Sequence, residues 1–145
     1  MKIDNIDRMI LNELKSNSRL SMSELGKRVN LSSPSVKERV KQMESFGVIK
    51  RYTLELDYEK LDLPIQCIIE ATLKNGDYKS FNKYIQTLSN VDFCYRIAGK
   101  ACYMLKVHFS TFSQAELFIN ELSPHVQTVT HFVFSQVPTS VSVKD

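Results

Sequence analysis

The sequence predicts an α+β protein in which an N-terminal winged helix-turn-helix is followed by a C-terminal ferredoxin-like βαββαβ sandwich. Three short helical patterns, each with its own capping residues, fill the first third of the 145-residue chain. Strand and helix patterns then alternate in the order of the sandwich. The charge divides at the same point: residues 1–51 hold eleven Lys and Arg against six Asp and Glu (net +5), and residues 52–145 hold eight against ten (net −2). A basic first third indicates a module that faces a polyanion.

The three helical patterns each have a recognisable start. Asp4 is placed to cap the first helix, and Ser21 and Glu24 have the spacing of a capping box that opens the second. The third helix begins with Ser33 as its N-cap and runs to about Phe46, where the next residue, a glycine, favours a left-handed C-cap. Two short helices joined by a tight polar turn are typical of a helix-turn-helix.

An alternating apolar stretch from Val48 to Leu56 follows the third helix and is typical of a β-strand. Such an arm completes a winged helix-turn-helix. We therefore assign residues 1–51 to a winged helix-turn-helix DNA-binding domain and residues 52–63 to a strand and hinge linker. Three-helix units also serve as protein-binding modules, so the pattern alone leaves that alternative open.

Residues 64–138 carry the order strand, helix, strand, strand, helix, strand, which predicts a ferredoxin-like domain. A sheet of this kind has helices on one face only, yet the predicted strands carry apolar side chains on both. Phe93 and Tyr95, for example, alternate with Cys94. Because the open face would expose such groups, we expect a second copy to cover it and form a homo-oligomer. Residues 139–145 are assigned to a polar tail.

The composition argues against several other classes of protein. Hydrophobic residues make up 43% of the chain, and no apolar run approaches the roughly 20 residues of a membrane span. The N-terminus lacks a signal-peptide core, so we expect a cytoplasmic protein. Cys67, Cys94 and Cys102 form no C-x-x-C pair, which argues against a zinc site or a disulfide framework. No group has the spacing of catalytic residues, so we expect no enzyme activity, no metal and no cofactor.

Short blocks spread over nearly the whole chain point to one family. They are Ile6-Asp7-x-x-Ile10-Leu11-x-x-Leu14, Ser18-Arg19-Leu20-Ser21, Glu24-Leu25-Gly26, Leu31-Ser32-x-Pro34-Ser35-Val36, Arg39-Val40-Lys41-x-Met43-Glu44-x-x-Gly47-Val48-Ile49, Ile97-Ala98-Gly99 and Tyr103-Met104-Leu105. In residues and spacing they resemble the Lrp/AsnC (leucine-responsive regulator, feast/famine) transcription factors of bacteria and archaea, and within them the LrpC-type branch.

The resemblance implies a regulator that binds double-stranded DNA with a sequence preference, associates with the nucleoid and bends or wraps the duplex. It also implies that residues 64–138 sense an effector and build dimers, and larger rings such as tetramers or octamers.

The third predicted helix is the one expected to enter the major groove of DNA. Val36, Val40 and Met43 face inward at helical spacing, so the DNA-binding residues are expected on the opposite face and just beyond the helix. These residues are Ser33, Ser35, Lys37, Glu38, Arg39, Lys41, Gln42, Lys50 and Arg51.

Different roles are expected along this helix. The candidates for base edges lie near its start and are Ser35, Lys37 and Glu38. The candidates for phosphate contacts are Lys41, Lys50 and Arg51. Arg39 has the chemistry either to read a guanine or to bind a phosphate, and the sequence leaves both open.

The stretch Gly99-Lys100-Ala101-Cys102-Tyr103 corresponds to the family's effector cleft. Members that bind amino acids follow this glycine with acidic residues, in a Gly-acid-aromatic-Asp-Tyr pattern, and those carboxylates can pair with the ligand's ammonium group. Here Lys100 and Cys102 stand where the acids are expected, so we predict no tight leucine-type response. A lysine would attract a carboxylate or another anion instead. Gly99 and Tyr103 either line the cleft or serve as a hairpin glycine and a packing tyrosine.

Two rival functions use the same two modules. One is a protein-interaction adaptor. The other is a redox-responsive adaptor that uses Cys94 and Cys102, with Arg96 and Lys100 as the nearby groups able to lower the pKa of a thiol.

Overall fold

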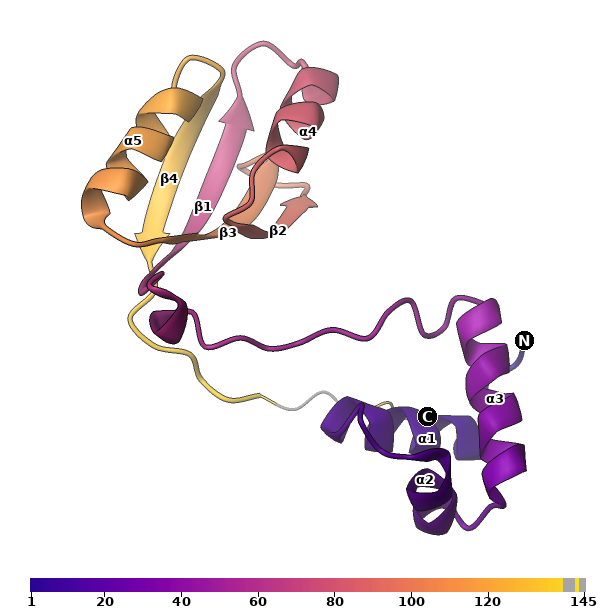
Figure 1. The fold of residues 1–145 in the computed structure, drawn as a ribbon. Helices are drawn as coiled ribbons and strands as arrows, with labels where there is room; N and C mark the ends of the chain where they lie inside the picture. Colours follow the sequence, from indigo (N-terminus) through magenta and orange to yellow (C-terminus); the bar gives the residue numbers. More distant parts are fainter. Residues whose placement is uncertain (140–142, 144–145) are drawn as a thin grey trace. The chain divides into compact units, whose positions relative to one another are not determined.

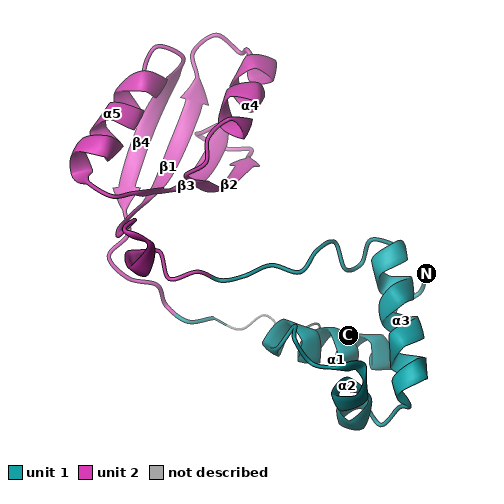
Figure 2. Ribbon diagram, in the orientation of Figure 1, with its two compact units in different colours: residues 1–55, 138–145 teal, residues 56–137 magenta. Residues whose placement is uncertain are grey.

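The chain folds into two compact units (Figures 1 and 2). The computed structural model describes residues 1–139 and 143. One unit comprises Met1–Glu55 and the described residues from Pro138 onward, and the other comprises Leu56–Val137. Each unit has its own hydrophobic core. Most of the predicted polar tail, residues 140–142 and 144–145, lies outside the described residues.

The first unit is built from three helices, and two of them begin as predicted. They are α1 (Asn5–Ser16), α2 (Met22–Val29) and α3 (Ser33–Ser45). Asp4 caps α1, because its Oδ1 accepts a hydrogen bond from the backbone N–H of Asp7 (2.8 Å). At α2 the Ser21 N–H donates to Glu24 Oε2 (2.9 Å) and the Glu24 N–H donates to Ser21 Oγ (3.2 Å), which confirms the capping box.

One apolar stripe from each helix, with Leu20 of the α1–α2 connection, forms the core of the first unit. Its buried members are Ile10, Leu14, Leu20, Leu25, Val29, Val36, Val40 and Met43. The stripe on α3 is the predicted one, so the opposite side of α3 faces solvent.

The turn between α2 and α3 is tight because the two helices approach each other at Gly26. The backbone N–H of Leu31 donates to the carbonyl of Gly26 (2.9 Å), and Asn30 adopts a left-handed conformation with φ 55°. A Cβ on Gly26 would lie 2.6 Å from the carbonyl oxygen of Leu31. The turn geometry therefore requires glycine at this position.

The start of α3 corrects one prediction. Ser32, not Ser33, is the N-cap: its backbone is extended (φ −69°, ψ 149°) and its Oγ accepts a hydrogen bond from the Ser35 N–H (3.3 Å). Ser33 is the first residue of the helix. Both serines suit a cap by residue type, and only the backbone conformation separates them.

The end of α3 is as predicted. Gly47 has φ 71°, and its N–H donates to the carbonyl of Glu44 (3.0 Å). The Val48 N–H donates to the carbonyl of Met43 (2.8 Å). These are the two hydrogen bonds of a Schellman C-cap, which turns the chain sharply out of the helix.

The strand predicted from Val48 to Leu56 does not form. Residues 50–57 have no regular secondary structure, and within the described part of the chain no strand pairs with them. Leu54 is 80% exposed and Tyr52 50% exposed. The alternating pattern is present, but a strand also needs a partner backbone, and this segment has none among the described residues. The predicted hinge contains a short 3₁₀ helix, Glu59–Leu61.

The second unit has the predicted order of strands and helices. Its elements are β1 (Ile65–Leu73), α4 (Tyr78–Gln86), β2 (Val91–Arg96), β3 (Tyr103–Phe109), α5 (Phe112–Leu122) and β4 (Val126–Phe132). The strands form one antiparallel sheet in the order β2-β3-β1-β4, with both helices packed on the same face (Figure 1). None of the described helices is long and apolar enough to cross a membrane.

The core of the second unit lies between the sheet and the two helices. On β1 the buried residues are Cys67, Ile69 and Ala71, which alternate with partly exposed residues of the other face. Phe81 of α4 and Phe118 of α5 cover them. Neither α4 nor α5 covers the opposite face of the sheet.

The β2–β3 connection is longer than predicted. The sequence predicts a two-residue turn at Gly99-Lys100, whereas the strands end at Arg96 and resume at Tyr103, which leaves residues 97–102 as a loop. The Cys102 N–H donates to the carbonyl of Ala71 on β1 (3.0 Å). This bond holds the returning chain against β1 before β3 begins.

Candidate nucleic-acid interface

The solvent-facing side of α3 presents two lysines. Lys37 and Lys41 are exposed and lie one helical turn apart, on a side of α3 that does not carry the buried Val36 and Val40. Within the described part of the chain, no carboxylate lies at ion-pair distance from either ammonium group. Both lysines are therefore available to a phosphate or a base edge.

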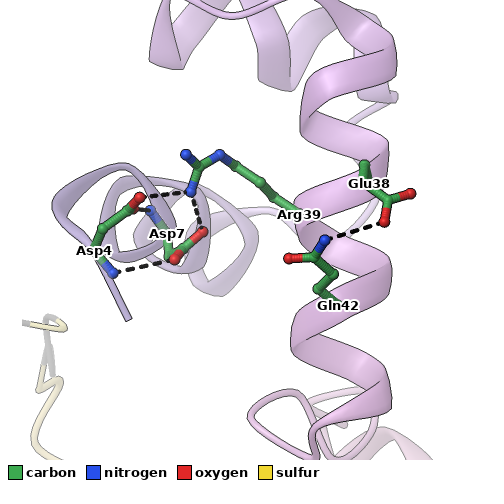
Figure 3. Close-up of polar contacts among 5 residues, drawn as sticks. All are labelled: Asp4, Asp7, Glu38, Arg39 and Gln42. Carbon is green, nitrogen blue, oxygen red and sulfur yellow. Dashed lines mark hydrogen bonds and ion pairs between the residues drawn. The ribbon is translucent and has the colours of Figure 1, made fainter. Parts of the chain in front are cut away.

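Arg39 lies at the edge of this surface and binds two carboxylates of its own unit (Figure 3). Its Nη1 donates to Asp7 Oδ1 and to Asp4 Oδ2, both at 2.8 Å. Asp7 is only 1% exposed, and it also accepts a hydrogen bond from the Asp4 backbone N–H (3.1 Å). The guanidinium thus joins the N-terminal cap of α1 to the middle of α3.

These contacts shift the protonation equilibria of the groups involved. Hydrogen bonds to Asp7 and Asp4 hold the pKa of Arg39 above its ordinary value. The backbone hydrogen bond from Asp7 and the Arg39 hydrogen bond lower the pKa of Asp4. Arg39 and Asp4 therefore keep opposite charges over the working pH range. Neither role predicted for Arg39 included this pair, because Asp4 and Asp7 are more than 30 residues away in the sequence.

The other polar candidates on α3 already bond to one another. Gln42 Nε2 donates to Glu38 Oε1 (3.1 Å) one turn away, as Figure 3 shows. The hydroxyls of Ser35 and Ser32 lie 2.7 Å apart. All four side chains are exposed, so these weak surface bonds can exchange for bonds to DNA. Ser33 is partly buried at the helix start.

Lys50 and Arg51 follow α3 on the chain and are both exposed. Neither has an ion-pair partner among the residues that the structure describes. The next residue, Tyr52, is tied back to α3 by a hydrogen bond from its hydroxyl to Glu44 Oε1 (2.9 Å). Partial burial and this carboxylate raise the pKa of Tyr52 to about 12. The bond holds the start of the arm beside the C-terminal end of α3.

The five candidate effector residues do not form one open surface. Gly99 and Lys100 are exposed in the β2–β3 loop, and Gly99 has φ 152°. Ala101 is buried, and Cys102 is half-buried, with the Tyr78 hydroxyl 3.7 Å from its Sγ. Tyr103 is 2% exposed, and its hydroxyl donates to Asn82 Oδ1 on α4 (2.7 Å). Tyr103 thus packs in the core of the second unit.

Models of two protein families match this chain. The model described as winged helix-turn-helix DNA-binding matches residues 3–50, and the Lrp/AsnC ligand binding domain matches residues 66–143. The HTH-type transcriptional regulator LrpC of Bacillus subtilis (strain 168) is 60% identical over 139 residues, with 96% of each chain covered. The chain belongs to the Lrp/AsnC family. This confirms the resemblance read from the sequence motifs, including its LrpC-type branch.

Solved structures agree with this assignment. The structure of B. subtilis LrpC superimposes with a TM-score of 0.93 and covers 97% of this Lrp/AsnC chain and 100% of that one, at 60% identity. A transcriptional regulator from Neisseria meningitidis, solved as an L-Met complex, has a TM-score of 0.90 at 26% identity and covers 99% and 97% of the two chains. The Leucine-responsive regulatory protein of Haemophilus influenzae is 38% identical over 115 residues, covering 77% and 69% of the chains.

None of the three cysteines of this Lrp/AsnC protein forms a disulfide. Burial raises the pKa of the Cys67 thiol to about 11 and raises the pKa of the Cys94 thiol as well. The reactive form of a cysteine is the thiolate, so both are held in the less reactive form. Arg96, which the sequence offered as an activating cation, lies over the ring of Tyr78, 4.1 Å from its centroid.

Proposed function

We propose that this Lrp/AsnC protein regulates transcription by placing α3 in the major groove of double-stranded DNA, with a preference for certain sequences, and that it acts in the cytoplasm on nucleoid DNA. The exposed pair Lys37 and Lys41 carries the proposal: both lie on the solvent-exposed surface of α3, without a carboxylate of the described chain at ion-pair distance. A 13-residue helix is about 20 Å long and fits a groove about 12 Å wide. Nothing in this role requires catalysis.

The contacts divide by position on α3. Ser35, Lys37 and Glu38 occupy the N-terminal half, which in recognition helices reaches the base edges. We assign Lys41, with Lys50 and Arg51 beyond the helix, to phosphates, which set the register on the duplex. Ser33 precedes the base-reading group on α3, and Gln42 follows Lys41 in the phosphate-binding group.

We assign Arg39 a positioning role. With its Nη1 held by Asp7 and Asp4, it fixes the angle between α1 and α3. Contacts to DNA then come from lysines whose orientation depends on that angle.

The open face of the sheet supports a homo-oligomer. Tyr95 is 62% exposed and Val129 52% exposed, and the rings of Phe93 and Tyr95 stack 4.8 Å apart on β2. An apolar surface of this kind on a folded domain marks an interaction site. We propose that a second copy covers it in a dimer, and that dimers assemble further into tetramers or octamers.

The unpaired arm after α3 fits the same proposal. Tyr52, Leu54 and Leu56 alternate along residues 52–56, and all three are exposed. Pairing with another strand gives the backbone N–H and C=O groups of such an extended segment their hydrogen-bond partners. A second copy of the arm offers such a strand. A two-fold dimer would set its recognition helices about 34 Å apart, or a multiple of that distance. Larger assemblies would favour DNA that bends easily.

We also propose that the hairpin of this member gives no tight leucine-type response. Lys100 supplies a positive charge where an amino-acid ligand would need a carboxylate for its ammonium group, and Tyr103 is buried rather than lining an opening. Isothermal titration calorimetry with leucine tests this directly. Heat of binding at micromolar leucine would refute it.

A salt-titrated gel shift tests the main proposal. Fragments from upstream of the protein's own gene are compared with random fragments of equal length. The proposal predicts retardation of both at low salt, a log–log salt slope of about −0.9 for each phosphate neutralised, and tighter binding to some upstream fragment. Tight binding with no preference would remove the regulatory part. No retardation at low salt would favour a protein-interaction adaptor.

A further inference from the structure

A groove of about 540 Å³ opens in the second unit between α4 and α5. Its floor is apolar and includes Leu73, Phe81 and Leu122, of which Phe81 is 5% and Leu122 1% exposed. The groove does not include any of the β2–β3 loop residues 97–102. Its volume is within the range of small-molecule sites, about 300–1,000 Å³.

Two carboxylates from different elements line the same groove. Asp77 is the N-cap of α4, and Glu121 lies in the last turn of α5. Asp77 Oδ1 accepts a hydrogen bond from the Ser80 N–H (3.0 Å), and hydrogen bonds from Ser80 lower the pKa of Asp77. Asp77 is therefore anionic at neutral pH.

Glu121 faces α4 across the groove. After burial, its negative charge is the second cause that raises the pKa of the Tyr84 hydroxyl, so the two groups are close in space. Tyr84 also lines the groove.

Neither carboxylate has an ion-pair partner among the described residues of the chain. No lysine or arginine among them lies at ion-pair distance from Asp77 or Glu121, and none lines the groove. Lys74, three residues before Asp77, donates its Nζ to the carbonyl of Ser123 (2.7 Å). A surface with an apolar floor and two carboxylates that have no ion-pair partner in the described chain is complementary to an organic cation.

We propose that this groove binds a small organic amine, with its apolar body on Leu73, Phe81 and Leu122 and its ammonium group facing Asp77 and Glu121. An amine without a carboxylate fits better than a zwitterionic amino acid, because the lining offers no lysine or arginine for a ligand carboxylate. All residues of the groove belong to the second unit, so the result of a DNA-binding experiment does not affect this proposal.

Titration calorimetry on the full-length chain tests the proposal with 2-phenylethylamine as the probe. Its anionic counterpart of similar size, 3-phenylpropionate, and zwitterionic phenylalanine serve as comparisons. We expect the amine to bind at least about tenfold tighter than either comparison ligand. Such a difference corresponds to the loss of one charge-assisted hydrogen bond between the ligand's ammonium group and a carboxylate of the groove. Equal binding of the anion, or no binding of the amine at about 10 mM, overturns the proposal.

Three variants locate the site. Glu121→Gln removes one charge, and Asp77→Ser removes the other while keeping a residue that caps α4. Glu116→Gln, on an exposed position of α5 outside the groove, is the matched control. The first two variants should each weaken amine binding about tenfold, and the control should not change it.

Sedimentation of the same variants distinguishes the other possible occupant. If the groove holds a second copy of the chain, Glu121→Gln will shift the oligomeric state while amine affinity stays unchanged. That outcome would overturn the proposal. An unchanged sedimentation coefficient with weakened amine binding supports it.

Discussion

Arg39 Nη1 lies 2.8 Å from Asp7 Oδ1, and this pair couples the helix proposed to enter DNA to the start of the chain. Asp7 is 1% exposed, whereas the Arg39 side chain is 30% exposed. A buried carboxylate needs its partner, because leaving it unpaired costs more than the pair itself contributes. The orientation of α3 therefore depends on a contact that lies beside the DNA-facing surface.

The Arg39→Ala variant should be less stable than the parent by about 2 kcal/mol, since it leaves Asp7 buried without its cation. Urea unfolding followed by circular dichroism measures the change. In a double-mutant cycle, Asp7→Ala and Arg39→Ala should couple by at least about 1 kcal/mol. Additive effects would show that the two side chains do not act together.

Gly26→Ala should destabilise the first unit by about 2 kcal/mol. The added methyl group would lie 2.6 Å from the Leu31 carbonyl, and backbone there cannot move without disturbing the turn before α3. Thermal unfolding provides the measurement, with Gly76→Ala in the second unit as the comparison, where space is open but φ is +68°. A wild-type melting temperature for Gly26→Ala would contradict the close approach described for the turn.

Replacing Lys50 and Arg51 by alanine should weaken binding to all DNA fragments to a similar extent. Phosphate contacts carry no sequence information, so the preference among fragments should persist. The log–log salt slope should become shallower by about 0.9 for each phosphate that the variant no longer neutralises. Fluorescence anisotropy at several salt concentrations gives both quantities. A selective loss of affinity for one sequence would move these residues to the base-reading group.

Cys67 should resist alkylation in the folded protein at pH 8. Its pKa is raised to about 11 from an ordinary value near 9, so the fold favours the neutral thiol. The corresponding stability is fully present below pH 9 and is lost as the pH rises through 11. Mass spectrometry after brief iodoacetamide treatment should show Cys67 unmodified until urea is added. Rapid modification of Cys67 and a loss of DNA binding on oxidation would revive the redox alternative.

The local signals in the sequence predicted most of the fold. Capping residues such as Asp4 and Ser21 act within three residues, and apolar periodicity at Val36, Val40 and Met43 directly reports burial. The prediction of the N-cap of α3 was wrong by one residue, because two neighbouring residues are both suited to cap a helix. Ser32 and Ser33 are both capping residues by type, and the backbone of the turn decides between them.

Sequence patterns did not predict the contacts between residues that are far apart in the chain. The Arg39 pair with Asp4 and Asp7 joins the cap of one helix to the flank of another, and no spacing rule links them. The same holds for Asn12, whose side-chain amide bonds to the backbone N–H (2.7 Å) and carbonyl (3.2 Å) of Val143. The strand predicted at Val48–Leu56 does not form for a related reason, because the described part of the chain offers it no pairing partner.

The structure changes which residues test the DNA interface most cleanly. Charge reversal at Arg39 would break the contact with Asp7, so weakened DNA binding could not be separated from a distorted fold. Lys37 and Lys41 have no such partner within the described chain. They are the residues on which a test of the interface can rest.

The most direct measurement compares DNA binding by two double variants at fixed salt. One is Lys37→Ala with Lys41→Ala on α3. The other is Lys79→Ala with Lys83→Ala, an exposed pair with the same spacing on α4. With both variants folded by circular dichroism, the α3 variant should bind a duplex at least about tenfold more weakly than the parent, while the α4 variant should bind like the parent. Parental affinity in the α3 variant would contradict the account of α3 as the DNA-binding helix.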